Sequence, residues 1–259
     1  MKTLYNIRKR CIAQQEKYLD IKKQRGMTLL EIIIVLGIIG TIAAGVVILA
    51  QRAFDAKAMT DLTNNINTVR TAMKDAYGTT GIYPVPAGTA TAALNDETLG
   101  DPTVGGLTPI GRLVALGKVS RDEARNNVSN DFISVGGANL SANGIQKGYF
   151  IEINGLNQQQ CRNVLLQAGN SFDYVETTNA AAAGQYSVNT APVNLYSALS
   201  GIVPGTPSTT PGTPGTPDML NGSGVFRSLA TGGNTLITAD GVIGACTDDS
   251  NNSVILGSR

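Results

Sequence analysis

Residues 25–49 read RGMTLLEIIIVLGIIGTIAAGVVIL, and the order of features in this stretch decides how the chain begins to fold. A basic, polar leader ends at Gly26, an apolar stretch follows directly, and one carboxylate, Glu31, lies within its first turns. Residues 32–50 carry no charge. At ~1.5 Å per helical residue they span roughly 28 Å, about the thickness of a bilayer's hydrocarbon core. The sequence therefore predicts a helix that can cross a membrane.

The leader indicates how this helix is oriented and what happens to it. Residues 1–26 contain eight Lys and Arg residues against Glu16 and Asp20, a net charge of +6, and such a flank stays on the cytoplasmic side. A secretory signal has its small-residue cleavage site after the apolar run, whereas Gly26 precedes the run here. A cut at Gly26 leaves the apolar segment on the mature chain. This order argues against simple secretion and against a plain membrane anchor.

Glu31 is the unusual residue of the apolar stretch. An acidic side chain at the centre of a membrane helix costs ~2.5–3.5 kcal/mol on insertion scales. Near the end of the helix the cost falls, because the side chain reaches the interface and the helix dipole favours a negative charge in the first turn. Two interpretations stay open. Glu31 is either a tolerated interfacial acid or a carboxylate that is neutralised when another subunit supplies a positive charge.

Several segments resemble one protein family. Residues 26–37 resemble the processing site and N-terminal segment of a type IV prepilin, the unprocessed form of a type IV pilin. The long leader and Met27 resemble the type IVb branch, which includes the toxin-coregulated pilin and the enteric colonisation-factor pilins. Segments 44–53, 113–124 and 155–161 are similar to parts of that subfamily. The likeness is strong over roughly residues 24–80, patchy to about residue 175 and weak beyond.

The resemblance implies roles for three residues. A prepilin peptidase is expected to cut after Gly26 and to N-methylate the new amino terminus of Met27. Glu31 is expected to pair with the Met27 amine of a neighbouring subunit as that subunit joins the growing pilus. Glycine offers no side chain to obstruct a protease, and the pairing relieves the cost of a buried acid. Removing the leader leaves 12 of the 20 basic residues and 17 of the 19 acidic ones, a net charge of −5.

After Ala50 the apolar pattern becomes a stripe with the 3.6-residue period of one buried helical face. The stripe consists of Phe54, Ala58, Leu62, Ile66, Val69, Met73 and Tyr77. No Pro occurs from Met27 to Tyr83, so one helix of about fifty residues is expected. Residues 27–50 form its membrane and polymerisation half, and residues 51–79 form an amphipathic half that packs on a soluble domain. An isolated coiled coil is the alternative for the second half.

Residues 80–259 are expected to form a globular α+β head, with an antiparallel sheet laid against the long helix. Ser120 and Glu123 match a capping box, which predicts a short helix, and Asn157 is a candidate N-cap for a helix carrying Cys161. The predicted strands are Tyr149–Ile153, Val225–Leu229, Thr235–Thr238, Gly241–Ala245 and Ser253–Leu256. The strand order cannot be deduced from these patterns.

The three cysteines separate by compartment. Cys11 lies in the leader, and Cys161 and Cys246 are the two cysteines of the mature chain. An oxidising periplasm favours a disulfide between them, with two free buried thiols as the alternative. The pairing also agrees with the C-terminal disulfide-bounded region of type IV pilins. Inside that region, residues 203–218 are rich in Pro, Gly and Thr and predict an exposed loop. The loop is a tolerated insertion, an antigenic or adhesive tip, or an O-glycosylated tract.

Signals for chemistry are missing from the sequence. There is no His, and no phosphate-binding loop, metal-spaced Cys pair or nucleophile motif occurs. We therefore expect that the protein is not an enzyme and binds neither a cofactor nor a metal ion. Asp248 and Asp249 resemble Ca²⁺ ligands in type, but an exposed turn is the simpler interpretation. The acidic mature chain is not expected to bind nucleic acid.

The leading hypothesis is the major structural subunit of a type IVb pilus, which polymerises into a surface fibre for adhesion, aggregation and colonisation. One alternative is a type II secretion pseudopilin or a minor pilin, and another is an uncleaved membrane-anchored binding domain. The expected partners are the prepilin peptidase and methyltransferase, the pilus assembly machinery and other copies of the chain. The expected location is the inner membrane, with a single span and a cytoplasmic N-terminus, and then the extracellular pilus.

Overall fold

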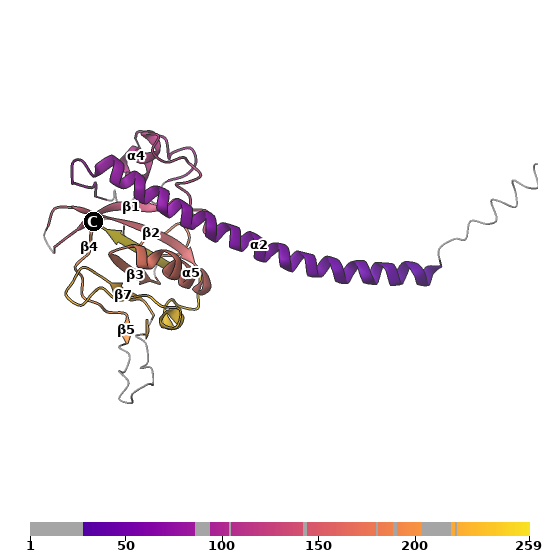
Figure 1. Ribbon diagram of the computed structural model, residues 1–259. Coiled ribbons are helices and arrows are strands. Elements are labelled where there is room, and N and C mark those ends of the chain that lie inside the picture. The colour runs from indigo at the N-terminus through magenta and orange to yellow at the C-terminus, as the bar shows by residue number, and fades with distance from the viewer. Residues whose placement is uncertain are drawn as a thin grey trace, which may run out of the picture. The chain divides into compact units, whose positions relative to one another are not determined.

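The computed structural model describes residues 28–85, 94–103, 105–141, 144–179, 181–188, 191–203, 219–220 and 222–259. The chain forms two compact units, residues 1–54 and 55–259. Helix α2 (Leu29–Tyr77) contributes to both units (Figure 1). The predicted leader and the Pro/Gly/Thr-rich segment beyond Val203 lie outside the described residues.

In the first unit, α2 exposes large apolar side chains around its surface. Leu29, Leu36 and Leu49 are 77%, 63% and 66% exposed. In the described part of the chain, α2 is the one helix whose length and composition suit a membrane crossing. An apolar surface of this size needs a covering of lipid or of other apolar helices.

In the second unit, α2 buries one face. Leu62, Ile66, Val69 and Met73 of the predicted stripe are all buried, so the amphipathic interpretation is confirmed over these turns. Phe54 is 71% exposed, and its inclusion in the buried stripe was wrong. The remaining buried residues of α2 are Met59, Asn65 and Ala72.

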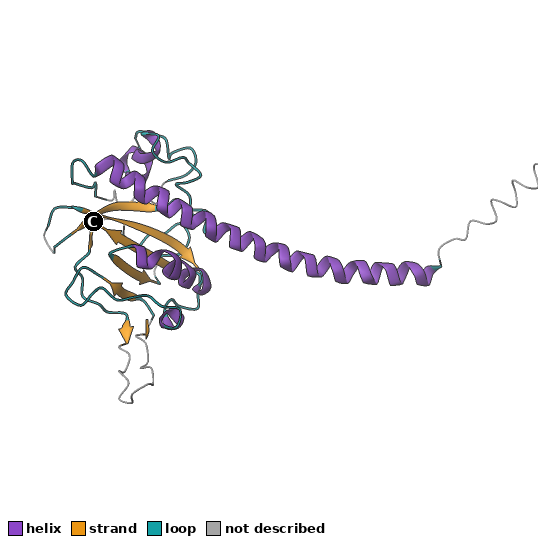
Figure 2. Ribbon diagram, in the orientation of Figure 1, coloured by secondary structure: helices purple, strands orange, loops and turns teal. Residues whose placement is uncertain are grey.

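Most of the second unit is built around a sheet, whose strands Figure 2 shows in orange. In the described part of the chain the sheet has six strands in the order β4-β1-β2-β8-β3-β7. These strands are β1 (Ser134–Asn139), β2 (Gly148–Leu156), β3 (Tyr174–Thr178), β4 (Val193–Asn194), β7 (Gly224–Arg227) and β8 (Asn252–Ser258). All neighbours are antiparallel except β1 and β4. Strand β8, the last strand along the sequence, lies between β2 and β3 in the sheet.

Short elements complete the unit. These are 3₁₀ helix η1 (Gly105–Leu107), α4 (Pro109–Ala115), α5 (Gln158–Ala168), η2 (Gly169–Ser171), η3 (Gly241–Gly244) and the paired strands β5 (Ile202–Val203) and β6 (Met219–Leu220). The predicted α+β class is confirmed.

The sheet has two buried faces. One face packs on α2 and α5 and contributes Tyr149, Ile151 and Leu256 to the larger hydrophobic core. The opposite face carries Phe150, Tyr174, Ile255 and other residues of a second, smaller core. Residues 188 and 191–199 cover this second face through Val188, Val193, Leu195 and Leu199. Strands buried on both sides contain few alternating polar positions, which explains why several of them were hard to recognise.

Local patterns predicted some of these elements correctly. Asn157 and Gln160 form the full capping box of α5: Gln160 N donates to Asn157 Oδ1 at 2.9 Å, and Asn157 N donates to Gln160 Oε1 at 3.0 Å. The strands expected at Tyr149–Ile153 and Ser253–Leu256 are present, and both are longer than predicted. The strand expected at Val225–Leu229 is present as β7 (Gly224–Arg227), which begins one residue and ends two residues earlier than predicted.

Ser120 does not begin a helix, and that prediction was wrong. Its capping contacts do form, because Ser120 N donates to Glu123 Oε2 at 2.8 Å and Glu123 N donates to Ser120 Oγ at 3.3 Å. The turn ends after Ala124, since Arg125 leaves it to pair with Phe132 in a β-bridge. A long-range pairing therefore overrides a local helix signal.

Two predicted strands are also wrong. Residues 235–238 form no strand; instead, the Asn170 side chain takes the place of a partner strand by donating to Ile237 O at 2.8 Å and accepting from Ile237 N at 3.0 Å. Residues 241–244 form the 3₁₀ helix η3 rather than a strand. Helix α4 and strands β1 and β3 were not predicted. Strand β1 was missed because it contains two glycines, one of which, Gly137, has no room for a Cβ beside Tyr83 O and Gln146 Cβ.

Candidate assembly site and disulfide-bounded region

Thr28 caps the start of α2 and places Glu31 in the first turn. Glu31 N donates to Thr28 O at 3.0 Å and to Thr28 Oγ1 at 3.3 Å, and Ile32 N donates to Thr28 O at 3.2 Å. The spacing of Thr28 and Glu31 is that of a capping box. A carboxylate at this position interacts favourably with the positive end of the helix dipole. The capping role of Thr28 was missed in the sequence, although the four-residue pattern was available to reveal it.

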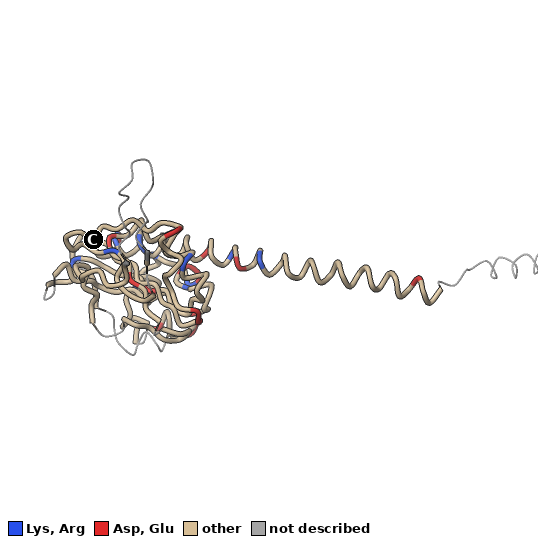
Figure 3. Tube along the Cα trace, turned by 90° about the horizontal axis from the view of Figure 1, so that it is seen from below, with Lys and Arg blue, Asp and Glu red and all other residues tan. Residues whose placement is uncertain are grey.

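Glu31 is isolated from other charges along its helix. The next charged residue of α2 is Arg52, and Figure 3 shows the uncharged run between them as an unbroken tan coil. Among the described residues, no Lys or Arg forms an ion pair with Glu31. The carboxylate is exposed and surrounded by exposed apolar side chains. Its position suits contact with a cationic group from outside the described residues. Gly26 and Met27, the predicted processing residues, lie outside those residues.

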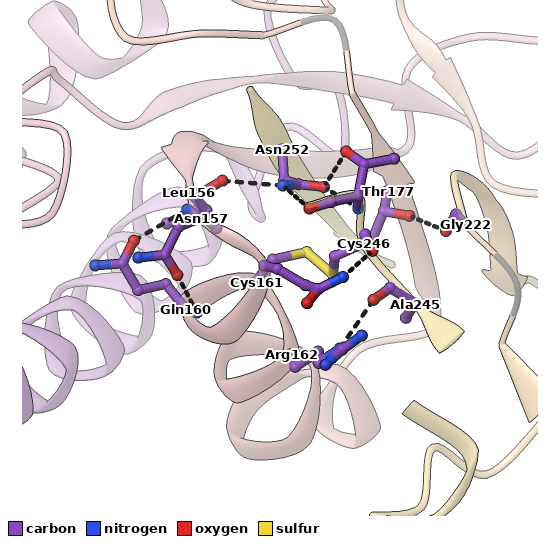
Figure 4. Close-up of a disulfide and its surroundings, with 12 residues drawn as sticks. Leu156, Asn157, Gln160, Cys161, Arg162, Thr177, Gly222, Ala245, Cys246 and Asn252 are labelled. Carbon is purple, nitrogen blue, oxygen red and sulfur yellow. Dashed lines mark hydrogen bonds between the residues drawn. A yellow bond between two sulfur atoms is a disulfide. The ribbon is translucent and has the colours of Figure 1, made fainter. Parts of the chain in front are cut away.

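The predicted disulfide is present. Cys161 of α5 is bonded to Cys246, with the two Cα atoms 6.3 Å apart and both residues buried (Figure 4). Two side chains of α5 reinforce the link: Gln158 Nε2 donates to Cys246 O at 3.2 Å, and Arg162 Nε donates to Ala245 O at 3.1 Å. The disulfide therefore anchors the segment that enters β8 to the first turns of α5.

Asn252 organises the turn that follows Cys246. Its buried amide nitrogen donates to Leu156 O at 3.1 Å, Thr247 O at 3.0 Å and Asp249 O at 3.0 Å, and its Oδ1 accepts from Thr247 N at 2.8 Å. Asp249 Oδ1 accepts from Asn251 N at 3.0 Å, so the carboxylate serves the turn itself. The turn interpretation of Asp248 and Asp249 is confirmed for residues 247–252. The described residues contain no group of three or more His, Cys, Asp or Glu side chains able to hold a metal.

Two carboxylates, the buried Glu152 and the half-buried Asp131, hold residues 181–188 on the second face of the sheet. Glu152 of β2 has no exposed surface and accepts from Ser187 N at 2.6 Å, Val188 N at 3.0 Å and Ser253 Oγ at 2.9 Å. Asp131 accepts from Gly184 N at 2.6 Å in the same segment. No local pattern in the sequence reveals these contacts, because each joins residues more than thirty positions apart.

Comparisons with known proteins agree with this architecture. A toxin coregulated pilin of Vibrio cholerae serotype O1 is 37% identical over 191 residues, which cover 71% of this chain and 78% of that protein. The chain belongs to the toxin-coregulated pilin family. A second toxin coregulated pilin of Vibrio cholerae is 40% identical over 154 residues, 59% of this chain and 61% of that protein.

Family models match two parts of the pilin. Residues 112–202 match the model of the toxin-coregulated pilus subunit TcpA, and residues 21–47 match the prokaryotic N-terminal methylation motif. The crystal structure of TcpA, a type IV pilin from the Vibrio cholerae El Tor biotype, has the same fold. It superposes with a TM-score of 0.54 at 22% identity and covers 78% of this chain and 99% of that one. The chain is a type IVb pilin subunit, from a family of structural pilins.

The pilin's predicted site residues thus fall into two groups. The structure joins Cys161 to Cys246 and places Glu31 in the first turn of α2, directly after its capping residue. These two sites belong to different compact units. The methylation motif spans Gly26, Met27 and Glu31, which groups the three N-terminal site residues in one recognised segment.

Proposed function

We propose that this pilin is the major subunit of a type IVb pilus, cleaved between Gly26 and Met27, N-methylated at Met27 and polymerised through its N-terminal helix. The match to the methylation motif over residues 21–47 supports the processing step. The site also has a physical basis. Helix α2 begins within three residues of Gly26, so cleavage there removes the basic leader and leaves the apolar helix complete.

The observation that carries the proposal is the position of Glu31. It lies in the first turn of an exposed apolar helix, and residues 32–50 offer it no counter-charge. When such helices pack together, the carboxylate loses water, and a buried unpaired charge is costly. The amine of Met27 on a neighbouring subunit faces the same cost. Pairing the two neutralises both charges and fixes how far one helix slides along the next.

The same helix serves two environments in turn. Before assembly it holds the pilin in the inner membrane, with the basic leader on the cytoplasmic side. After cleavage it packs among the helices of other copies in the fibre. The proposed divisions are residues 1–26, the leader; 27–50, the membrane and polymerisation segment; 51–79, the amphipathic helix; and 80–259, the head. The prepilin peptidase and the assembly machinery act on this segment, and the fibre carries the heads for adhesion, aggregation and colonisation.

Mass spectrometry of the mature protein tests the processing step. We expect the chain to begin at N-methylated Met27. An intact leader contradicts the proposal and favours an uncleaved membrane-anchored domain.

Glu31→Gln tests the assembly step, because it removes the charge and keeps the shape of the side chain. We expect normal cleavage and membrane insertion but a loss of fibres in electron micrographs. Glu97→Gln, at an exposed acid of the second unit, is the matched control and should assemble normally. Normal fibres from Glu31→Gln contradict the pairing. If deletion of the gene leaves fibres of normal number and length, the pilin is a minor pilin or a pseudopilin.

A further inference from the structure

A pocket of about 290 Å³ opens on the second face of the sheet, away from α2 and α5. It is lined by residues of β3 and β7 and by residues 187–188, 191–194 and 197. The polar groups that line it come from Tyr174, Glu176, Ser187, Asn194 and Ser197. Apolar walls come from Val188, Val193 and Val225. The whole pocket lies within the second unit.

Glu176 is the charged residue of this pocket, and none of the described lining residues is Lys or Arg. One of its oxygens, Oε2, accepts a hydrogen bond of 2.7 Å from the Tyr174 hydroxyl. The other oxygen, Oε1, accepts no hydrogen bond from a described residue.

The nearest basic residue of the sheet is directed elsewhere. Strand β3 pairs with β7, but the register shifts between Val175 and Glu176, so that Val175 pairs with Arg227 and Glu176 pairs with Val225. Paired residues of neighbouring strands face the same side. Arg227 therefore shares the side of Val175, which belongs to the larger core, and its Nη1 donates to Thr235 O at 3.4 Å. The bulge separates the guanidinium from the pocket.

The electrostatic consequence is a carboxylate that lacks a cation. Burial raises the pKa of Glu176, the hydrogen bond from Tyr174 opposes this rise, and the negative charge of Glu152 adds to it. Glu152 does not compete for the same role, because its oxygens are occupied by two backbone amides and the Ser253 hydroxyl. A cation in the pocket supplies the missing partner and favours the ionised form of Glu176.

We propose that this pocket binds a primary ammonium group, with Glu176 as its counter-ion. An ammonium is a compact point charge with three donors. Ser197 and Asn194 line the pocket together with Glu176 and add acceptor oxygens to it, although Asn194 Oδ1 already accepts from Tyr196 N at 3.1 Å and Ser197 Oγ donates to Asn194 O at 2.8 Å. Val188, Val193 and Val225 contact the methylene stem of such a ligand. A guanidinium suits the site less well, because its fork engages both carboxylate oxygens and Tyr174 already occupies one. A divalent metal ion needs more oxygen charge than one carboxylate provides.

Calorimetric titration of the full chain in detergent with n-butylammonium chloride, at constant ionic strength, tests the proposal. We expect saturable binding at one site per chain, and no binding of the neutral analogue n-butanol. Glu176→Gln should lower the affinity at least about tenfold. Glu97→Gln changes an exposed carboxylate that does not line the pocket and should leave binding unchanged.

A measurement on the unaltered chain tests the proposal even if the variant fails to fold. Binding of the ammonium should release protons from Glu176, so the observed heat should depend on the ionisation enthalpy of the buffer, and the affinity should fall at acidic pH. The proposal is overturned if the unaltered chain shows no saturable binding, if n-butanol binds equally well, or if Glu176→Gln binds as tightly as the unaltered chain.

A comparison of single subunits with assembled fibres distinguishes the source of the ammonium group. This comparison rests on the proposed function, because it requires that the chain forms fibres. Binding of n-butylammonium by both forms assigns the pocket to a free small amine. Binding by single subunits alone assigns it to a Lys side chain of a second copy, which occupies the pocket in the fibre. The pilin exposes suitable side chains, such as Lys57, which is 72% exposed. Loss of fibres with normal ammonium binding by subunits contradicts the assembly proposal but not this one.

Discussion

Glu152 of β2 and Glu176 of β3 both pair with Ile255 of β8, one from each side. The two carboxylates therefore lie in one row across the sheet, on the face opposite the long helix. Their environments differ. Glu152 accepts three hydrogen bonds that fix a covering segment, whereas Glu176 receives one from Tyr174 and borders a pocket. The first acts as a structural anchor, and the second is a candidate for ligand binding and pH response.

The raised pKa of Glu176 predicts how stability depends on pH. The folded chain holds the proton more tightly than the unfolded chain, whose Glu pKa is about 4.5. The free energy of unfolding should therefore fall as pH rises from 4.5 through the raised folded-state pKa. The Gln side chain of Glu176→Gln cannot titrate, so in this variant the free energy of unfolding should fall less over the same pH range. Urea unfolding across this pH range, followed by tyrosine fluorescence, measures the difference.

Tyr174→Phe is the companion variant for that prediction. Removing the hydroxyl takes away the hydrogen bond that opposes the rise in the pKa of Glu176. The pKa should therefore rise further, and the fall in the free energy of unfolding should extend to higher pH. Parallel pH profiles for the unaltered chain and Glu176→Gln contradict the assignment.

Glu152→Ala should destabilise the second unit more than loss of an exposed acid. The change leaves Ser187 N, Val188 N and Ser253 Oγ without their acceptor. At a net contribution of about 1 kcal/mol per hydrogen bond, the loss is about 3 kcal/mol in total. Hydrogen exchange resolved by mass spectrometry should show faster exchange over residues 181–188 than over β8. Glu97→Ala is the control, and equal exchange in both variants contradicts the anchoring role.

The two capping boxes offer a matched pair. Asn157→Ala should lower the free energy of unfolding by about 1 kcal/mol, because Asn157 caps the eleven-residue helix α5. Ser120→Ala should cost less, because the same type of contact there closes a single turn. Urea unfolding of both variants measures the comparison. A larger loss from Ser120→Ala contradicts this view of the turn.

These capping boxes also show how far the sequence predicts the structure. The helix after Asn157 depends on residues within one turn, so its local pattern was sufficient. The segment after Ser120 carries an equally good pattern, but the pairing of Arg125 with Phe132 decides its course, and that contact is not encoded locally. Residues 235–238 have the β-branched and apolar composition of a strand, yet the Asn170 side chain takes the place of a partner strand.

The same distinction between local patterns and long-range contacts applies to the candidate sites. Glu31 stood out because an acid in an apolar run conflicts with its own neighbours in sequence. Glu152 and Glu176 did not stand out, because a polar residue in a strand ordinarily faces water. Their burial depends on residues 181–188 and 191–199, which cover the second face of the sheet. The register shift that separates Arg227 from Glu176 likewise exists only once β3 and β7 have paired.

The final prediction concerns the disulfide. It closes a sequence separation of 85 residues, and the chain-entropy model gives a stabilisation of about 4 kcal/mol for a loop of this size. The double variant Cys161→Ala with Cys246→Ala should lose about this free energy of unfolding in urea. Because Gln158 and Arg162 hold residues 245–246 independently, the second unit should still fold, and β8 should remain protected from hydrogen exchange.

Two further measurements separate the covalent link from the effect of the substitutions. Reduction of the unaltered chain should lower its stability by a similar amount, whereas the reductant should leave the double variant unchanged. Gln158→Ala and Arg162→Ala in the double-variant background remove the remaining hydrogen bonds and should then expose β8 to exchange. If the double variant loses protection of β8 by itself, the disulfide, rather than the side chains of α5, holds the C-terminal strand in place.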